Sequence, residues 1–321
     1  MKAAVLYEAG GPEKFIVEEK PVSQPGPGQV LIAVKAFGLN RSELMTRKGY
    51  SPNVKFPRVL GIECVGLVEN DPSGEFAKGQ QVAAIMGEMG RQYDGSYAEY
   101  VTVPKHIVMP FKSSLPWEQL GAFPEMFQTV FGSLHLALNI ASGDTILIRG
   151  GTSSIGMLAT QVARNFGLTV IATTRNASKT ELLKQNGAHE VIIDDGNISA
   201  KLSASSAGID KLLDLVGTFS LGDSLKCVKP GGTVCMTGML SEQWSIADFA
   251  PMEYIPATVK LTVYDSGQVT LEPRHFQNFI QDVEAGRVRL NVSGVFPLAK
   301  IAEAHALMES NQASGKIVGV P

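Results

Sequence analysis

The chain has 321 residues, of which 44% are hydrophobic and 18% charged, and 28 Lys and Arg residues against 31 Asp and Glu residues give a formal net charge of −3. This apolar content disfavours a disordered chain, and the length exceeds the roughly 100 to 200 residues of one compact core, which predicts two domains. Because no block of Lys or Arg occurs, nucleic acid and anionic membranes are disfavoured as main partners, and we expect a small-molecule ligand.

The cysteines and the apolar segments bear on the compartment. Cys64, Cys227 and Cys235 are too few and too widely spaced for a disulfide framework, which favours a reducing environment. The opening MKAAVLYEAG contains no apolar stretch of signal-peptide length, and no segment approaches the roughly 20 apolar residues needed to span a bilayer. We therefore expect a cytoplasmic protein without a membrane span.

The first 110 residues have the pattern of an antiparallel β structure. Short apolar runs, among them AAVLY, FIVEE, VLIAVKA, CVGLVE, QQVAAIM and SYAEYVTVP, alternate with turns rich in Gly and Pro. The exception is Asn40 to Lys48, where Leu44 and the stem of Arg47 lie one helical turn apart behind a plausible N-cap.

From about residue 120, strand-length apolar runs alternate with amphipathic segments of helix length. TILIRGG precedes SSIGMLATQVARNFG, TVIATT precedes SKTELLKQNGA, and VIIDD, KLLDLVG, TVCMTG and KLTVY continue the series. Such alternation is typical of a parallel sheet covered on both faces, so residues 121–267 are predicted to form a doubly wound α/β domain. Two further helices, in HFQNFIQDVEAGRV and AKIAEAHALMES, and a strand, KIVGV, are predicted after it.

The strongest local signal is the turn that follows the run beginning at Thr145. It reads Gly151-x-Ser153-x-x-Gly156, with serine replacing the middle glycine of the G-x-G-x-x-G pattern. A dinucleotide pyrophosphate needs a close backbone approach at a helix N-terminus, and serine is small enough to allow it and adds a hydroxyl donor. Its place in a βαβ unit predicts a dinucleotide site, although a tight turn without a ligand gives the same short pattern.

The end of the next strand discriminates between the two nicotinamide cofactors. An NAD site normally places Asp or Glu about 20 residues after the glycine turn, whereas a 2′-phosphate requires positive charge. Here Thr174 is followed by Arg175, Ser178 and Lys179, with no acid before Glu181. The sequence favours NADPH. Alternatively the two cations are solvated residues at a helix start, where the helix dipole disfavours them.

Several separated motifs together resemble the medium-chain dehydrogenase/reductase superfamily, in its zinc-independent, quinone oxidoreductase-like branch. They are the opening MKAAVLYEAGGPE, Gly38 to Glu43, Pro57 to Gly66, Gly95 to Tyr100, and the glycine turn. The resemblance implies an α/β protein with a GroES-like β-rich catalytic domain at residues 1–120 and 268–321. It implies a Rossmann doubly wound parallel-sheet cofactor domain at 121–267, a substrate site between the domains, and a homodimer.

The resemblance also raises the question of a metal. Zinc-dependent relatives use a Cys, a His and a further Cys or Asp as ligands, but this chain has Asn40 and Ile62 at the first two of these positions. These side chains do not supply a three-ligand zinc site, so no metal is predicted. Glu63, retained from the superfamily pattern, is expected to form a structural salt bridge. Cys64 is expected to be a small buried residue.

Without a Lewis acid the acceptor must already be electrophilic, which favours a quinone or an α,β-unsaturated carbonyl. A nicotinamide supplies the hydride, while the protein orients the acceptor and stabilises the resulting oxyanion. The expected activity is NADPH-dependent reduction of such an acceptor. A low-activity NADPH-binding structural or regulatory protein is the alternative, and a zinc alcohol dehydrogenase requires ligands that the chain lacks.

The resemblance suggests Asn40, Arg41 and Tyr50 as catalytic residues. Asn40 is equally suited to capping the following helix, and Tyr50 to surface packing. The cofactor contacts that follow from the glycine turn and the resemblance are Asn40, Thr129, Gly151, Ser153, Ser154, Ile155, Gly156, Thr174, Arg175, Lys179, Gly238, Met239, Val263 and Tyr264. Asp194 stands where NADPH-binding relatives often carry an aromatic residue beside the adenine.

Overall fold

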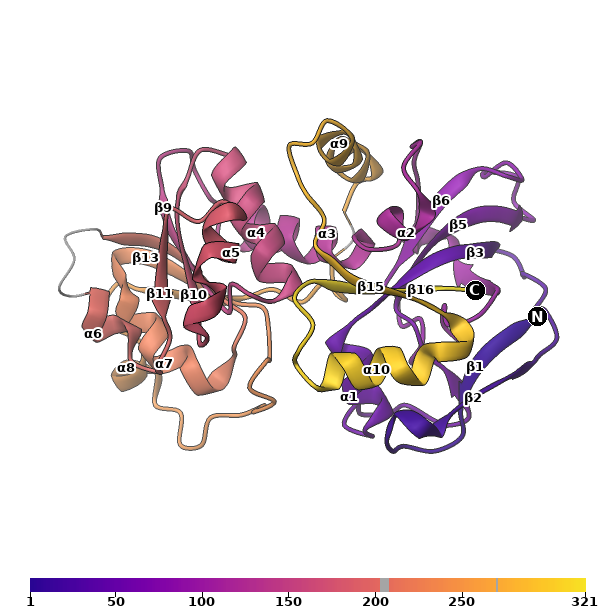
Figure 1. The fold of residues 1–321 in the computed structure, drawn as a ribbon, viewed down its shortest axis with the longest axis horizontal. Coiled ribbons are helices and arrows are strands. Elements are labelled where there is room, and N and C mark those ends of the chain that lie inside the picture. The colour runs from indigo at the N-terminus through magenta and orange to yellow at the C-terminus, as the bar shows by residue number, and fades with distance from the viewer. Residues whose placement is uncertain (203–207, 270) are drawn as a thin grey trace. The chain divides into compact units, whose positions relative to one another are not determined.

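The computed structural model describes residues 1–202, 208–269 and 271–321, and the chain forms two compact units (Figure 1). The first, called the β-rich unit, comprises Met1–Phe127, Thr270–Gly286 and Leu290–Pro321. The second, called the parallel-sheet unit, comprises Gln128–Val269 and Arg287–Arg289. No helix in the described ranges is both long enough and apolar enough to cross a bilayer.

The β-rich unit contains a seven-stranded sheet and a three-stranded sheet. The larger sheet has the order β15-β16-β3-β5-β6-β8, with β7 paired to β3, and the smaller has the order β2-β1-β4. All pairs are antiparallel except β15 with β16, as the alternating runs and tight turns predict. The strands are β1 (Lys2–Leu6), β2 (Phe15–Glu19), β3 (Gln29–Leu39), β4 (Arg58–Val59), β5 (Glu63–Asn70), β6 (Gln81–Ile85), β7 (Tyr100–Pro104), β8 (Val108–Pro110), β15 (Val292–Pro297) and β16 (Lys316–Val320).

Helices also belong to the described part of this unit. They are α1 (Arg41–Arg47), α2 (Trp117–Leu120), α9 (Pro273–Glu284) and α10 (Ile301–Glu309). The expected helix near Asn40 is α1. Strand β15 was not predicted, because its sequence, VSGVFP, is short and carries Gly and Pro.

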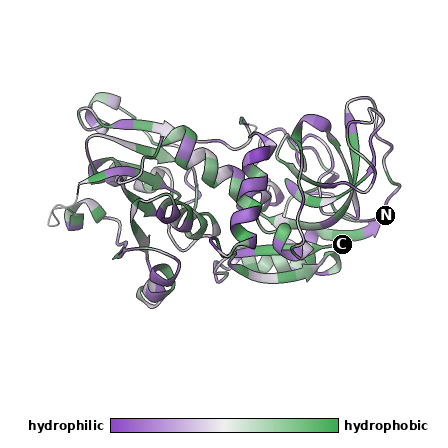
Figure 2. Ribbon diagram, turned by 90° about the horizontal axis from the view of Figure 1, so that it is seen from above, coloured by the Kyte–Doolittle hydropathy of each residue, from purple (hydrophilic) through white to green (hydrophobic). Residues whose placement is uncertain are grey.

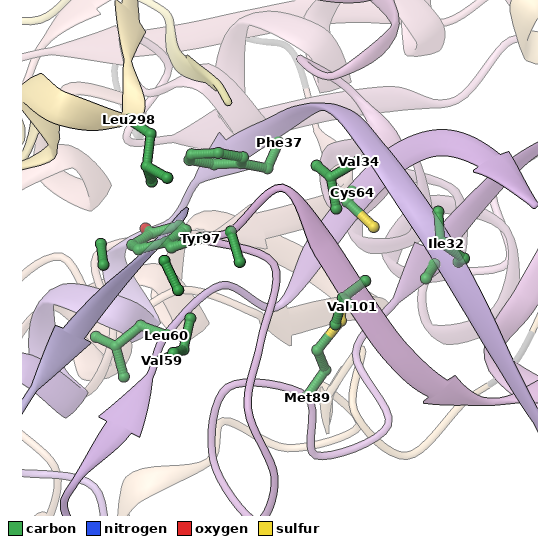
Figure 3. Packing of buried hydrophobic residues seen from close by; sticks show 14 of the residues in the cluster. Ile32, Val34, Phe37, Val59, Leu60, Cys64, Met89, Tyr97, Val101 and Leu298 are labelled. Atoms are coloured by element: carbon green, nitrogen blue, oxygen red, sulfur yellow. The ribbon is translucent and has the colours of Figure 1, made fainter. Parts of the chain in front are cut away.

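The core of the β-rich unit consists mainly of aliphatic side chains, among which the rings of Phe37 and Tyr97 pack together (Figure 3). Tyr97 is fully buried, and its ring centroid lies 4.8 Å from that of Phe37, beside Leu298. Cys64 also lies inside this core, where burial raises the pKa of its thiol to about 12. It is therefore the small buried residue that the sequence predicts, protonated at neutral pH.

The parallel-sheet unit has six parallel strands in the order β11-β10-β9-β12-β13-β14. The chain moves outward from β9 in one direction and from β12 in the other, which is the doubly wound arrangement that the sequence predicts. Hydrophobic residues dominate its strands, whereas its helices carry both hydrophobic and hydrophilic residues (Figure 2). The strands are β9 (Thr145–Arg149), β10 (Thr169–Thr174), β11 (Glu190–Ile193), β12 (Ile209–Asp214), β13 (Val228–Met236) and β14 (Lys260–Val263).

The helices of this unit are α4 (Ser154–Asn165), α5 (Thr180–Gln185), α6 (Ile198–Leu202), α7 (Thr218–Cys227) and α8 (Pro251–Tyr254). Helix α3 (Pro124–Phe131) leads into it and continues as a π-helical turn at Gly132–Ala137. Gly132 permits this packing, because a Cβ there would overlap the phenol ring of Tyr264. The Tyr264 hydroxyl donates a hydrogen bond to the Gln128 carbonyl at 3.0 Å.

Gly132→Ala should lower the free energy of unfolding by about 1 to 3 kcal/mol, because the added methyl group overpacks against a buried ring. Urea unfolding measures the change. In a Tyr264→Leu background the same substitution should be much less destabilising.

Gly26→Ala is the matched control. The nearest neighbour of a Cβ at Gly26 is a glutamine side-chain oxygen 3.4 Å away, which is an ordinary contact. Equal losses at both glycines, or no coupling between Gly132 and Tyr264, would contradict the overlap.

Candidate functional site

The glycine turn joins the carboxyl end of β9 to the start of α4. Ser153 is the N-cap of this helix, and its hydroxyl oxygen accepts a hydrogen bond from the Gly156 N–H at 3.0 Å. The same hydroxyl donates to the Gly150 carbonyl at 2.8 Å, so its proton forms a hydrogen bond within the turn and is not directed at a ligand. The donors that an α-helix leaves without an intrahelical partner here are the backbone N–H groups of the first turn, which contains Ser154 and Ile155.

Close packing explains the glycines of the turn. A Cβ at Gly156 would lie 2.5 Å from the Gly150 carbonyl oxygen, and one at Gly151 would lie 3.0 Å from the Thr173 carbonyl oxygen. Gly150, which the sequence pattern did not single out, has a φ of +87°, a conformation that favours glycine. The turn is therefore pressed against β10, with its helix N-terminus open to an anion.

Ser153→Ala should reduce the free energy of unfolding by about 1 kcal/mol, since it removes the cap of a 12-residue helix. Ser154→Ala, one position into the helix, is the control and should leave stability within about 0.5 kcal/mol of wild type. Thermal or urea unfolding of the two variants distinguishes them. A neutral Ser153→Ala would show that the cap contributes little.

The end of β10 carries the charges expected to select the cofactor. The buried Thr174 hydroxyl accepts from the Asn176 N–H at 3.1 Å, and the Asn176 carboxamide accepts from the Ser178 N–H at 2.9 Å. This small turn presents Arg175 in an exposed position, with no side-chain partner among the residues that the structure describes. Lys179 lies half-buried at the end of the turn.

A buried ion network lies directly behind the glycine turn. Arg149 is 1% exposed and binds Asp194 through two hydrogen bonds of 2.8 and 3.0 Å and Asp223 through one of 2.8 Å. Burial alone would lower the Arg149 pKa, but its hydrogen bonds and ion pairs outweigh burial and raise it. Asp194 is thus a structural partner of Arg149, a role that its sequence position did not reveal.

The other expected cofactor contacts lie just after β13, at and after the end of β14, and within α3. Because carboxyl ends of parallel strands share one sheet edge, Gly238 and Val263 lie at the same edge as the glycine turn. Gly238 packs tightly against Leu215, and Met239 is half-buried. Val263 is exposed. Tyr264 is buried with its hydroxyl on Gln128, next to the buried Thr129.

The β-rich unit holds a second polar group, the Asn40 cluster, made of Asn40, Glu43, Glu63 and Lys316. The Lys316 ammonium lies 2.7 Å from Glu63 Oε1 and donates to Asn40 Oδ1. Asn40 Nδ2 donates to the same Glu63 oxygen at 2.9 Å. The second oxygen of Glu63 accepts from the Glu125 N–H at 2.7 Å. The expected salt bridge of Glu63 is confirmed.

Glu43 fixes the backbone beneath this cluster. Asn40 is the N-cap of α1, and the Glu43 carboxyl group, three residues on, accepts from the Asn40 N–H and, at 2.8 Å, from the Ile62 N–H. Burial raises the pKa of Glu43 to about 8. Asn40 therefore combines the capping position with a place in the ion cluster.

The remaining catalytic candidates lie apart from the cluster. The Arg41 guanidinium donates to Asn311 Oδ1 at 2.6 Å. Tyr50 is 61% exposed, and the structure leaves its role as a prediction. Arg47 is fully buried and pairs with Glu309 at 2.6 Å, which is a structural contact. Of the three catalytic candidates, the structure brings only Asn40 to this cluster.

Comparisons with known proteins agree with this architecture. Residues 26–113 match the alcohol dehydrogenase GroES-like domain family, and residues 186–318 match the zinc-binding dehydrogenase family. A quinone oxidoreductase of Lama guanicoe is 29% identical over 333 residues, covering 99% of this chain and 97% of the relative. A 2-haloacrylate reductase of a Burkholderia species is 28% identical, covering 99% of this chain and 98% of the relative.

Among solved structures, a mycobacterial protein complexed with NADPH has a TM-score of 0.87 at 26% identity, with 100% of both chains covered. The β-rich unit and the doubly wound parallel-sheet unit have the architecture of these similar dehydrogenases and reductases. The chain belongs to the medium-chain dehydrogenase/reductase superfamily, in its quinone oxidoreductase-like branch, and is an oxidoreductase.

The zinc in one matched family's description does not fit the residues found here. Asn40 and Ile62 stand where the resemblance implies a cysteine and a histidine, and the Lys316 ammonium binds the oxygens of both Asn40 and Glu63. Within residues 1–202, 208–269 and 271–321, no three His, Cys, Asp or Glu side chains are grouped to hold a metal ion. The charge partner of Glu63 is a lysine.

The raised pKa of Glu43 predicts a pH dependence. An unfolded Glu titrates near pH 4.3 and the folded Glu43 near pH 8, so the folded chain holds an extra proton between these values. Its contribution to the free energy of unfolding is full below about pH 4 and should fall by about 5 kcal/mol as the pH rises through 8.

Urea unfolding from pH 5 to 9 measures this slope. Glu43→Gln should be less stable at pH 5, because an amide nitrogen cannot accept from a backbone N–H, yet should lose less stability as the pH rises. Glu303→Gln, at an exposed position on α10, should retain the wild-type slope. Equal slopes in all three proteins would contradict the assignment.

Proposed function

We propose that this oxidoreductase transfers a hydride from NADPH to a quinone or an α,β-unsaturated carbonyl without a metal ion. The proposal is supported by two neighbouring features: the N-terminus of α4 after Gly151, and an exposed Arg175 at the end of β10 that has no side-chain partner among the described residues. A pyrophosphate suits the first and a 2′-phosphate the second. The similar mycobacterial protein that binds NADPH supports this choice.

The residues of the parallel-sheet unit would hold the cofactor in a defined way. The first-turn N–H groups of α4 would bind the pyrophosphate, while Gly151 and Gly156 allow its close approach. The turn from Thr174 to Ser178 would place Arg175 beside the 2′-phosphate, and Lys179 would add positive charge there. Gly238, Met239 and Val263 would follow the nicotinamide half. Bound NADPH supplies a hydride.

Asn40 is proposed as the group that orients the acceptor. Reduction places negative charge on the acceptor oxygen, and an amide N–H can donate a hydrogen bond to it. We propose that water supplies the proton that completes the reduction. The quinone and 2-haloacrylate substrates named for two similar proteins are both electron-poor acceptors, which supports this substrate class.

The initial rate of NADPH oxidation with a simple quinone, and then with a simple enone, tests the activity. We expect turnover that depends on the acceptor, continues in the presence of a chelator, and is faster with NADPH than with NADH. Loss of activity with a chelator would overturn the metal-free mechanism. Tight NADPH binding without turnover on either acceptor class would favour a binding protein.

The cofactor assignment predicts the effect of removing one charge. Arg175→Ala should raise the KM for NADPH about 10- to 100-fold, because a charge-assisted contact to the 2′-phosphate is lost. The KM for NADH should change less than two-fold. Arg164→Ala is the matched control, since Arg164 is also exposed but lies at the far end of α4. Equal effects on both cofactors would contradict the phosphate contact.

We further propose that the protein is a cytoplasmic homodimer, as the family resemblance implies. Strand β14 ends the six-stranded sheet and carries the exposed Val263, which is compatible with pairing at that edge. Sedimentation at micromolar concentration gives the assembly mass. A monomer would overturn this part of the proposal alone.

A further inference from the structure

Lys316 is the first residue of β16 and is only 2% exposed, while its partner Glu63 is fully buried. A buried ion pair is poor evidence for a stabilising role, because desolvation offsets much of the attraction and apolar replacements are often as stable. Specific positioning is one reason for burying such a pair. The Asn40 carboxamide contacts both members of the pair.

The contacts among these three side chains select one orientation of the Asn40 carboxamide. Its Oδ1 accepts from the Lys316 ammonium, and its Nδ2 donates to Glu63 Oε1 at 2.9 Å. Rotation by 180° would place the carbonyl oxygen against the carboxylate and the NH₂ group against the ammonium. Both contacts would then be repulsive, so the ion pair fixes Oδ1 beside Lys316 and Nδ2 beside Glu63.

The rest of the cluster prevents the group from shifting as a whole. Glu63 is held at its second oxygen by the Glu125 N–H, and the Asn40 backbone N–H is held by Glu43. Both contacts are buried or half-buried and come from separate elements, α3 and α1. The amide is therefore fixed from its backbone and from both side-chain atoms.

One donor of this amide stays available. Nδ2 carries two hydrogens, and Glu63 takes one of them. The second has no partner in the part of the chain that the structure describes, and Asn40 is half-buried where Glu63 and Lys316 are fully covered. The ammonium on Oδ1 draws electron density from the amide, which strengthens the remaining N–H as a donor.

We propose that the Lys316–Glu63 ion pair is a positioning device that orients and polarises Asn40, so that its second Nδ2 hydrogen binds the oxygen on which charge develops during reduction. The proposal rests on the function proposed above. For an enone, hydride adds to the β-carbon, the C=C electron pair shifts to form the enolate, and a proton from water completes the saturated carbonyl, with NADP⁺ as the oxidised product. Lys316 and Glu63 touch neither substrate nor cofactor in this scheme.

Lys316→Met tests the positioning role, since it keeps an unbranched side chain that is one atom shorter and removes the charge. We expect kcat with a quinone or an enone to fall about 10- to 100-fold, because a misoriented group near the reacting atoms has an effect of this size. The KM and the dissociation constant for NADPH should stay within two-fold. Lys78→Met, which breaks an exposed ion pair of the β-rich unit, should retain wild-type kcat.

A double-mutant cycle separates positioning from general stabilisation. Asn40→Ala should lower kcat at least as far as Lys316→Met, and the Asn40→Ala/Lys316→Met double variant should be no slower than Asn40→Ala alone. Lys316→Arg should restore part of the rate. Multiplicative losses in the double variant would overturn the proposal, as would a Lys316→Met variant with wild-type kcat.

An NMR measurement that requires no turnover tests the positioning of Asn40 separately from the proposed enzymatic activity. With asparagine-selective ¹⁵N labelling, the Asn40 side-chain amide is the NMR signal missing from Asn40→Ala. It should shift and broaden in Lys316→Met but remain unchanged in Lys78→Met. Where Lys316→Met does not fold, Lys316→Met/Glu63→Gln removes both charges and should show the same loss of amide order. An unchanged amide signal would overturn the positioning role, whereas an ordered amide in a protein that reduces no acceptor would overturn the proposed function instead.

Discussion

The buried ammonium of Lys316 is the constraint on which the β-rich unit's polar site depends. A cation removed from water requires anionic and polar partners, and leaving it unpaired is strongly destabilising. Glu63 at the start of β5 and Asn40 at the end of β3 meet this need. Three elements converge at one point because one charge must be balanced there, and the catalytic candidate Asn40 is held by that balance.

The parallel-sheet unit solves a related problem with Arg149. This residue ends β9, immediately before the glycine turn, and is buried between Asp194 and Asp223. Its hydrogen bonds join the loop after β11 to helix α7, so the surroundings of the turn are fixed by charge as well as by packing. In each unit a buried cation at the first or last residue of a strand is held by polar side chains from other elements.

Sequence patterns predicted the features that are encoded locally. The strand, turn and helix around Gly151 and Ser153 follow from periodicity, capping and glycine placement within about 20 residues, and the parallel sheet follows from repeated apolar runs. The pairing of Lys316 with Asn40 spans 276 positions, and no local pattern encodes such a contact. The sequence does contain a signal for the second ion network. Arg149 directly follows the apolar residues of a buried strand, and a charged side chain at such a position needs an oppositely charged partner.

The position of β16 in its sheet has a consequence for the order of folding during synthesis. This strand pairs with β15 and with β3, so the larger sheet of the β-rich unit lacks an interior strand until residues 316–320 leave the ribosome. By then the parallel-sheet unit has been synthesised as one nearly continuous segment, and it can fold as a unit. Until Lys316 arrives, Glu63 has no ammonium partner, and water must solvate its carboxylate in the nascent chain. The Asn40 cluster is thus completed only after the whole parallel-sheet unit has been synthesised.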